Sequence, residues 1–292
     1  MSTTIKFLTD TTCDLPEELL DELQVEAVPL HVLLGGKDHL DGVDVTREEL
    51  YDYANRTREL PKTAAVSELQ FVDAFKRAFA NGAEHIIYTG ISSKISATLQ
   101  NAALAKQDLA EQGMDVSNIH LIDSLQLSTG SAHLLFEGVE MAKKGIEPEE
   151  IVRRLEAYKA RLSTSFVVDT LTYLHMGGRC SSLAYVAGSM LRLHPQIDMK
   201  DGSLQAGEKF RGSIYRALEQ YQKKMVTSRL DTIDNKRIFI TQTMTDFSYA
   251  QEAKRQIESL GYFENVYVTY AGATISSHCG PNTLGYLYAK KA

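Results

Sequence analysis

The stretch that decides the fold is "HIIYTGISSKISATLQNA" at residues 85–102, because it joins three different patterns in one short segment. "HIIYT" is an apolar run with the length and composition of a buried strand. Gly90 marks a turn, and hydroxyl side chains crowd the residues that follow it. "ISATLQNAALAKQDLAEQG" then has the periodicity of a helix. A strand that passes through a short turn into a helix is the repeating unit of a parallel sheet covered by helices.

The same alternation continues on both sides of this unit. "IKFLT" and "IHLID" have strand patterns, and an apolar-striped helix is expected from "SELQFVDAFKRAFANG", where Ser67 and Gln70 have the spacing of a capping box. Asp14 and Glu17 have the same spacing before an earlier helix. Residues 1–162 are therefore predicted to form an N-terminal three-layer α/β/α domain with a parallel sheet.

The pattern changes in residues 163–292. "SFVVDTLTYL" is expected to be a strand that enters the glycine turn "MGGRCSS", and a mostly apolar helix is expected at Leu183–Leu193. Asp201-Gly202 is a two-residue hairpin signal. Strands "RIFITQT" and "NVYVTYA" alternate with helices, and "ISSHCGPNTLGYLYAKKA" is expected to be a loop and a final strand. This half is predicted to be a C-terminal α/β domain with a mixed sheet.

Composition excludes several functional classes. The net charge is −7 and no block of basic residues is present, which argues against a nucleic-acid partner. No run approaches the roughly 20 apolar residues of a membrane span, and the first residues lack the apolar core of a signal peptide. The three cysteines form no CxxC pair, so a reducing cytoplasm is expected.

Common catalytic motifs are absent. The sequence contains no GxGxxG, GxxxxGK, HExxH or GxSxG pattern, which disfavours dinucleotide, P-loop, zinc-protease and α/β-hydrolase functions. The eight histidines are scattered along the chain, so neither a metal site nor a cofactor is predicted.

Polar residues follow the predicted strands of the first half at Asp10–Thr12, Thr89–Ser93 and Asp123–Ser124. Ligands of open α/β sheets gather at the carboxyl ends of the strands, so these segments are candidate site elements. A helix N-terminus offers free N–H groups, and the hydroxyls of Ser93 and Ser96 add uncharged donors that suit a carboxylate or a phosphate. These serines could equally serve only as helix caps.

Four further positions are ambiguous in the same way. Thr63 precedes a capped helix, and its hydroxyl could bind a ligand or only its own turn. Arg179 follows two glycines that permit close approach, and it could meet an anion or form a surface ion pair. Arg211 lies between a strand and a helix, and His278 lies in a Gly-Pro turn. The last two gain importance only if the fold brings them together.

Seven segments in order give the chain a resemblance to a known family. They are "TDTTCDLP" (9–16), "PKTAAVS" (61–67), "ISSKISATLQNA" (91–102), "IDSLQLSTG" (122–130), "YLHMGGRCS" (173–181), "KFRGS" (209–213) and "HCGPN" (278–282). These segments are similar to motifs of the DegV family, the fatty-acid-binding subunits of bacterial fatty acid kinase, and the resemblance spans nearly the whole chain.

The resemblance implies one long-chain fatty acid in a buried tunnel between and within the two domains. Its carboxylate would be bound by Thr63 and Ser93 with His278 beside them, and a separate kinase would use ATP to convert it to an acyl-phosphate for phospholipid synthesis. The chain itself would be a cytoplasmic carrier and not an enzyme, with transient membrane contact for lipid exchange.

Arg211 and His278 would contact the phosphoryl group or the kinase, and Arg179 would lie at the tunnel mouth or partner surface. Supporting residues would be Ser92, Ser96, Asp10, Asp123, Ser124 and Gly178, and tunnel lining would include Leu99, Ala102 and the helix Leu183–Leu193.

The chain departs from the family pattern beside the expected head-group site. Ala64, Ala65 and Val66 stand where the family has Ser-Gln-Pro, which removes a hydroxyl and an amide. Asn282 replaces a glycine in the histidine motif, and asparagine tolerates left-handed backbone angles.

Two other functions stay open on the same scaffold. One is an enzyme acting on a small phosphorylated or carbonyl substrate, as in the related dihydroxyacetone kinases, although no histidine of the first half has an equivalent placement. The other is a sensor of a small anionic metabolite.

Overall fold

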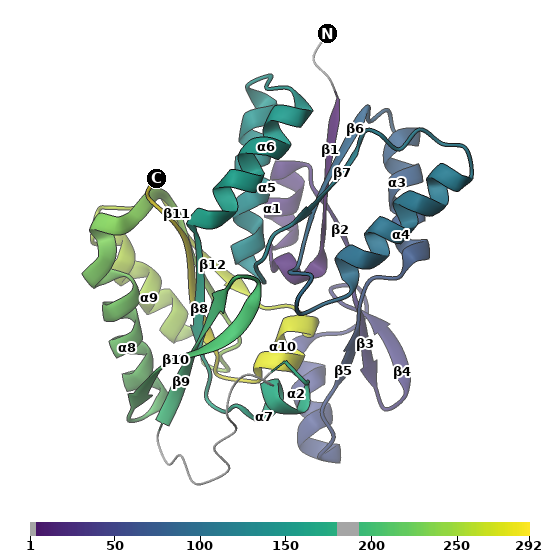
Figure 1. Ribbon diagram of the computed structural model, residues 1–292. Coiled ribbons are helices and arrows are strands. Elements are labelled where there is room, and N and C mark those ends of the chain that lie inside the picture. The colour runs from purple at the N-terminus through teal and green to yellow at the C-terminus, as the bar shows by residue number, and fades with distance from the viewer. Residues whose placement is uncertain (1–3, 180–192) are drawn as a thin grey trace.

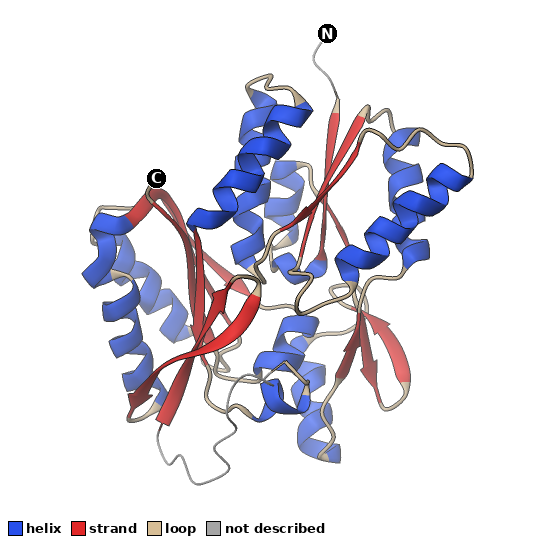
Figure 2. Ribbon diagram, viewed as in Figure 1, coloured by secondary structure: helices blue, strands red, loops and turns tan. Residues whose placement is uncertain are grey.

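The computed structural model describes residues 4–179 and 193–292 and contains a parallel sheet and a mixed sheet, each flanked by helices (Figures 1 and 2). The α/β fold predicted from the sequence is confirmed. The helix expected at Leu183–Leu193 lies outside the described residues except for Leu193, which begins a strand instead.

The first sheet has four strands in the order β2-β1-β6-β7, all parallel. Helices cover both of its faces (Figure 1). The strands are β1 (Ile5–Asp10), β2 (Glu26–Val28), β6 (His85–Gly90) and β7 (Ile119–Asp123). The helices are α3 (Glu68–Ala80) and α4 (Thr98–Glu111) on one face, and α1 (Glu17–Leu23), α5 (Thr129–Lys143) and α6 (Pro148–Tyr158) on the other.

A small antiparallel sheet in the order β4-β3-β5 lies beyond the carboxyl edge of the first sheet, next to α2 (Arg47–Thr57) (Figure 1). Its strands are β3 (His31–Leu34), β4 (Lys37–Leu40) and β5 (Lys62–Ala64). Thr63, expected in a loop, is therefore in a strand, where it pairs with Val32.

The second sheet has six strands in the order β10-β9-β8-β13-β11-β12, and only the β11–β12 pair is parallel. The expected hairpin at Asp201-Gly202 is present, and both residues have the positive φ angles, 50° and 78°, that a tight hairpin turn requires. The strands are β8 (Leu162–Val167), β9 (Leu193–Lys200), β10 (Ser203–Arg211), β11 (Ile233–Gln242), β12 (Asn265–Tyr270) and β13 (Leu284–Lys290), with α8 (Ile214–Met225) and α9 (Ser248–Glu258) on the outer face.

Two short helices occupy segments that were expected to be extended or irregular. "TLTYL" was predicted to continue a strand, but α7 spans Thr172–Met176. "ISSHC" was predicted to be a loop, but α10 spans Ala273–Cys279 and carries His278 in its last turn. Both corrections concern residues that line the site described below.

The two sheets are joined through a shared apolar core. One cluster contains Phe7 of the parallel sheet, Leu135 of α5, and Phe239 and Leu287 of the mixed sheet, all at most 4% exposed. The division into residues 1–162 and 163–292 stays a prediction: the second sheet begins at Leu162, but this cluster continues across the boundary.

Among the described helices, none combines the length and hydropathy that a membrane crossing demands.

Candidate functional site

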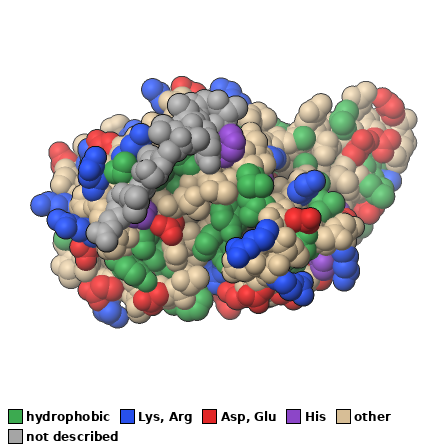
Figure 3. All heavy atoms as spheres, turned by 90° about the horizontal axis from the view of Figure 1, so that it is seen from below, with side chains coloured by type: hydrophobic (Ala, Val, Ile, Leu, Met, Phe, Trp, Pro, Cys, Tyr) green, Lys and Arg blue, Asp and Glu red, His purple; other side chains and the backbone are tan. Residues whose placement is uncertain are grey.

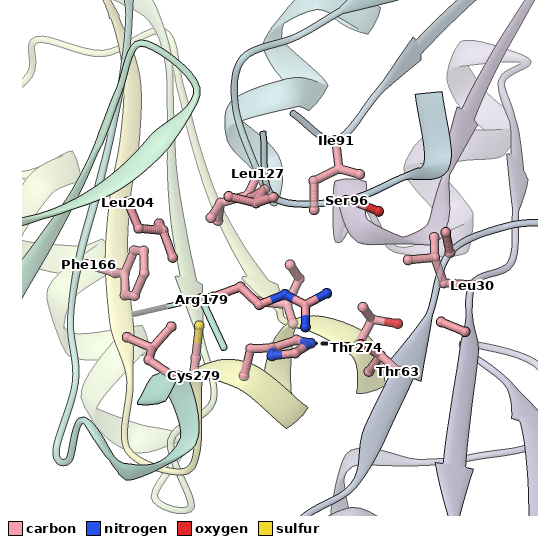
Figure 4. Close-up of a pocket in the computed structure, with 16 residues that line it drawn as sticks. Leu30, Thr63, Ile91, Ser96, Leu127, Phe166, Arg179, Leu204, Thr274 and Cys279 are labelled. Carbon is pink, nitrogen blue, oxygen red and sulfur yellow. Dashed lines mark hydrogen bonds between the residues drawn. The ribbon is translucent and has the colours of Figure 1, made fainter. Parts of the chain in front are cut away.

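A cavity lies where the carboxyl ends of the parallel strands face the mixed sheet (Figure 4). The free space inside it has a volume of about 50 Å³. Both halves of the chain contribute. The lining residues are Leu30, Thr63, Ala64, Ala65, Ile91, Ile95, Ser96, Leu127, Phe166, Leu174, Arg179, Leu204, Thr274, Ile275, His278 and Cys279.

One side of the cavity is apolar and adjoins a second, smaller cavity of about 20 Å³. Leu127, Phe166, Ile275 and Cys279 line both of them. In Figure 4, Leu127, Phe166, Leu204 and Cys279 face the same side of the space. The two cavities adjoin through the four residues that line both, and the second also has Thr241, Gln242 and Thr283 of the second half of the chain in its lining.

The opposite side carries the polar groups. Thr63 Oγ1 lies 2.7 Å from Nε2 of His278, and the guanidinium of Arg179 projects between the apolar side and Thr63 (Figure 4). If Nε2 of His278 carries the ring proton, it donates to Thr63 Oγ1, and the Thr63 hydroxyl is left to donate elsewhere. Three donors from β5, α10 and the segment after α7 then converge on one end of the cavity.

His278 is neutral at physiological pH. Burial, and secondarily the positive charge of Arg179, lower the pKa of His278 to about 4. The positive charge at this end of the cavity therefore comes from Arg179, which is held by a hydrogen bond from Nη1 to the carbonyl oxygen of Gly177. Because the one ring proton of neutral His278 is donated to Thr63, the Thr63 hydroxyl and the Arg179 guanidinium are the donors left for a carboxylate.

The glycine pair before Arg179 has two separate roles. Gly178 has a φ of 71° in the turn that ends α7, and it lies outside the cavity lining. A Cβ atom at Gly177 would collide with the imidazole of His278. The close approach expected from these glycines is thus between α7 and α10.

Two buried carboxylates position α10, and no pattern in the sequence connects them with that helix. Asp41 accepts hydrogen bonds from the backbone N–H groups of Ala273 (2.7 Å) and Thr274 (3.0 Å), and Asp14 accepts one from Gly272 (2.7 Å). Burial raises the pKa of both carboxyls. The first half of the chain therefore caps the helix of the second half that carries His278.

The expectation for Asp14 was different. It has left-handed backbone angles (φ 53°), and the N-cap of α1 is Pro16, so Asp14 does not cap the helix that follows it. The signal that could have identified its role is a short acid in a largely apolar, strand-terminal segment, where a buried carboxylate needs N–H donors from elsewhere.

The three serines of the turn after β6 separate into different environments. Ser92 is buried and donates to the carbonyl oxygen of Gly202 in the β9–β10 turn. Ser93 is exposed and donates to Asp123. Ser96 is half-buried and lines the cavity, whereas Ser93 does not. The structure therefore places Ser93 away from Thr63 and His278, because the turn between Ser92 and Ser96 directs its side chain toward β7.

The other expected supporting residues hold the strand ends together. Asp10 is buried and accepts hydrogen bonds from the hydroxyl of Tyr88 (2.8 Å) and the N–H of Ile91 (3.1 Å). Ser124 is buried and accepts one from the N–H of Gln126. Asp10, Asp123 and Ser124 thus fix the carboxyl edge of the sheet, and none of them lines the cavity.

Three expected residues lie away from the cavity. Arg211 is exposed at the end of β10, seven residues beyond the lining residue Leu204, which in a strand corresponds to about 23 Å. Leu99 and Ala102 pack in the apolar cluster between α3, α4 and the parallel sheet. The expected tunnel lining by these two residues is not observed.

A surface groove leads to the polar end of the cavity. It shares Thr63, Arg179 and His278 with the cavity, and Arg58 and Lys62 add positive charge to its wall. The view from below shows Lys and Arg side chains beside hydrophobic ones on this side of the molecule (Figure 3). The polar end therefore adjoins the groove, while the side chains that line the second cavity are buried.

Comparison with known proteins gives a consistent result. The family model described as "Uncharacterised protein, DegV family" matches residues 4–291. A fatty-acid-binding DegV family protein from Thermus thermophilus shares 28% identity, covers 98% of this chain and 100% of its own, and superposes with a TM-score of 0.88. A stearic-acid-binding protein from Eubacterium ventriosum shares 28% identity over 99% of both chains, with a TM-score of 0.84.

A third solved structure has the same fold at lower sequence identity. It is the B3 protein of fatty acid kinase from Streptococcus pneumoniae, loaded with linoleic acid. Its identity to this chain is 21%, it covers 99% of this chain and 100% of its own, and its TM-score is 0.83.

Proposed function

The chain belongs to the DegV family, and from this premise we propose that it binds one long-chain fatty acid and presents the carboxylate to a separate kinase. The observation that carries the proposal is the pair of adjoining cavities, which share buried apolar lining on one side and have Thr63, Arg179 and His278 on the other. The fatty acids bound by the solved relatives support the choice of ligand.

We place the carboxylate at the polar end. Thr63 donates its hydroxyl proton, with His278 holding that hydroxyl in place, and Arg179 supplies the positive charge. Ser96 takes the role that the family resemblance implied for Ser93, because its side chain lines the cavity (Figure 4). Arg179 stands at the junction of cavity and groove, as expected for the mouth.

The acyl tail supplies most of the affinity. Each buried CH₂ group contributes about 0.8 kcal/mol, so a long chain gains far more from the apolar end than the head group gains from three hydrogen bonds. The head-group donors set orientation, because a carboxylate placed in the apolar end would be left without partners. A small anionic metabolite, the ligand of the alternative enzyme or sensor, would leave that end unfilled.

The groove gives a route for phosphoryl transfer. A carboxylate oxygen of the bound lipid would attack the γ-phosphorus of ATP held by the kinase, forming the acyl-phosphate and releasing ADP. Arg58, Lys62 and Arg179 would offset the negative charge that accumulates there. Arg211, exposed and distant from the cavity, is in our proposal a contact for the partner rather than for the phosphoryl group. In this scheme the chain performs no chemistry alone and needs no cofactor.

Native mass spectrometry of the purified chain tests lipid binding. The expected result is one fatty acid per chain that survives gel filtration and is released by organic extraction. Thr63→Val keeps the shape and removes the donor, so we expect about a 10-fold loss of affinity for oleate, equal to the roughly 1.4 kcal/mol of a hydrogen bond to a charged group. A lipid-free protein without measurable oleate affinity would contradict the proposal.

The kinase step needs a separate test. The oleate-loaded chain is mixed with ATP and a fatty acid kinase catalytic subunit, and the acyl-phosphate is trapped with hydroxylamine. Product is expected only when both proteins are present. Firm lipid binding with no product from any such subunit would leave the carrier function intact and remove the kinase partnership.

A further inference from the structure

Two histidines meet at the edge of the parallel sheet opposite the lipid cavity. His85 begins β6 and His120 is the second residue of β7. His120 pairs with Ile87, two residues after His85, so both imidazoles project from the same face of the sheet. α6 covers this face, and its first turn carries Glu149 (Figure 1). We propose that His85, His120 and Glu149 bind a zinc ion.

The spacing of the two imidazoles fits a shared metal. Nδ1 of His85 lies 3.3 Å from Nε2 of His120. Two nitrogen ligands at the usual Zn–N distance of about 2.0–2.1 Å and a tetrahedral angle are separated by about 3.3–3.4 Å. The ring centroids lie 5.6 Å apart, and the two ring planes are 2° from parallel.

Glu149 completes the ligand set. One of its carboxylate oxygens and the two ring nitrogens all lie within 4.8 Å of one another. Glu149 is exposed, so its side chain can rotate to bring the oxygen to the metal, and the two histidines are half-buried and held by the sheet. Two imidazoles and one carboxylate with a fourth position open to solvent are a common zinc arrangement, and imidazole favours zinc over magnesium or calcium.

The sequence disfavoured a metal site because its histidines are scattered. His85 and His120 are 35 residues apart, and only the pairing of β6 with β7 brings them together. A bound ion would connect two strands and a helix at the amino end of the sheet. The site is independent of the proposed lipid function, because none of its three residues lines the lipid cavity or the groove.

Zinc binding to the full chain, purified without a histidine tag and stripped with EDTA, tests the proposal. Titration with zinc chloride against a chromogenic chelator should give one ion per chain. When a residue that hydrogen-bonds to a metal ligand is lost, the metal affinity typically falls by about 10–100-fold. Loss of a ligand itself should cost more, so we expect His85→Asn and His120→Asn each to lower the zinc affinity by at least about 100-fold. Cobalt chloride should give the intense visible absorption of a tetrahedral site, and His120→Asn should abolish it.

Glu149→Gln keeps the fold, because the side chain is exposed, and should weaken zinc binding by at least about 10-fold. His39→Gln is the matched control, since His39 lies 3.6 Å from Asp44 in a different sheet; it should bind zinc as the wild type does. Zinc should raise the melting temperature of the wild type more than that of any of the three ligand variants at the same zinc concentration. The proposal is overturned if the wild type shows no saturable binding of one zinc, or if Glu149→Gln and His120→Asn bind it unchanged.

Discussion

The turn from Gly90 to Thr98 and the helix α10 both follow a strand and both bear polar side chains, but they use them differently. In the turn, Ser92 donates to Gly202 and Ser93 donates to Asp123, so most of its hydroxyls are satisfied within the protein. In α10, the backbone N–H groups are capped by acids from the other half of the chain, and His278 at the opposite end faces the cavity. A dense group of hydroxyls is therefore a weaker indication of a ligand site than a single polar side chain whose partners come from distant segments.

The largest test of this comparison removes a cap of α10. Asp41→Ala leaves the N–H groups of Ala273 and Thr274 buried without a partner, and each unsatisfied group costs about 1–3 kcal/mol. The free energy of unfolding in urea should fall by about 2–5 kcal/mol, and oleate affinity should fall with it because α10 carries His278. The control Asp52→Ala, exposed on α2, should change stability by less than about 0.5 kcal/mol. Equal stabilities of the two variants would show that the cap is dispensable.

The next test concerns the charge state of His278. Its folded-state pKa is about 4, below the 6.5 of the free side chain, so its contribution to stability is fully present above pH 6.5 and is lost as the pH falls through 4. At about 1.36 kcal/mol per pKa unit, the stability difference between wild type and His278→Gln should shrink by up to about 3 kcal/mol between pH 7 and pH 4. Wild type and His278→Gln must be compared at each pH because His133 also has a lowered pKa, about 3, and titrates in both proteins. A pH-independent difference, measured by urea unfolding, would mean that His278 is not desolvated.

A third test contrasts two serines of one turn. Ser96→Ala should weaken oleate binding by about 5- to 10-fold, equal to the roughly 1 kcal/mol of one hydrogen bond, because Ser96 lines the cavity. Ser93→Ala should leave the affinity within about 2-fold, because its hydroxyl is bonded to Asp123. Isothermal titration of both variants decides the assignment. A larger loss of oleate affinity in Ser93→Ala than in Ser96→Ala would return the head-group role to Ser93.

The smallest expected effect is at the alanines beside Thr63. Ala64 and Ala65 line the cavity where the family pattern has Ser and Gln. Ala65→Gln should shift the preferred acyl length toward shorter chains, with a change of about 1 kcal/mol or less per CH₂ displaced. Competition between palmitate and stearate measures the shift, and Ala80→Gln at the end of α3 is the control. An unchanged preference would indicate that these alanines do not contact the lipid.

The sequence predicted the elements whose signals are local. The alternation of the first half, the capping box of Ser67 and Gln70, and the Asp201-Gly202 turn are all present, because each depends on neighbours within a few residues. α7 and α10 were missed because α10 is stabilised by Asp14 and Asp41, more than 200 residues earlier, and the two short helices pack against each other.

For the candidate site too, the structure brings together only some of the residues that the sequence analysis singled out. Thr63, Arg179 and His278 meet at one cavity, although two of the three lie on elements that were not expected. Ser93 was preferred to Ser96 through the family resemblance, because the local sequence does not show which hydroxyl of a tight turn points inward. Arg211 lies on an exposed strand end, which no local pattern distinguishes from a site residue.

If the chain binds a fatty acid as proposed, the capping of α10 by Asp14 and Asp41 makes retention of that lipid depend on both halves of the chain. The carboxylates that hold the helix and the imidazole that it carries belong to opposite ends of the sequence, so any opening between them dismantles the head-group site before the tail is exposed. A ligand that binds only the closed form adds its binding free energy to the cost of that opening. Release of the fatty acid and local unfolding of α10 are then the same event. A partner protein that loosens α10 would release the fatty acid without contacting it.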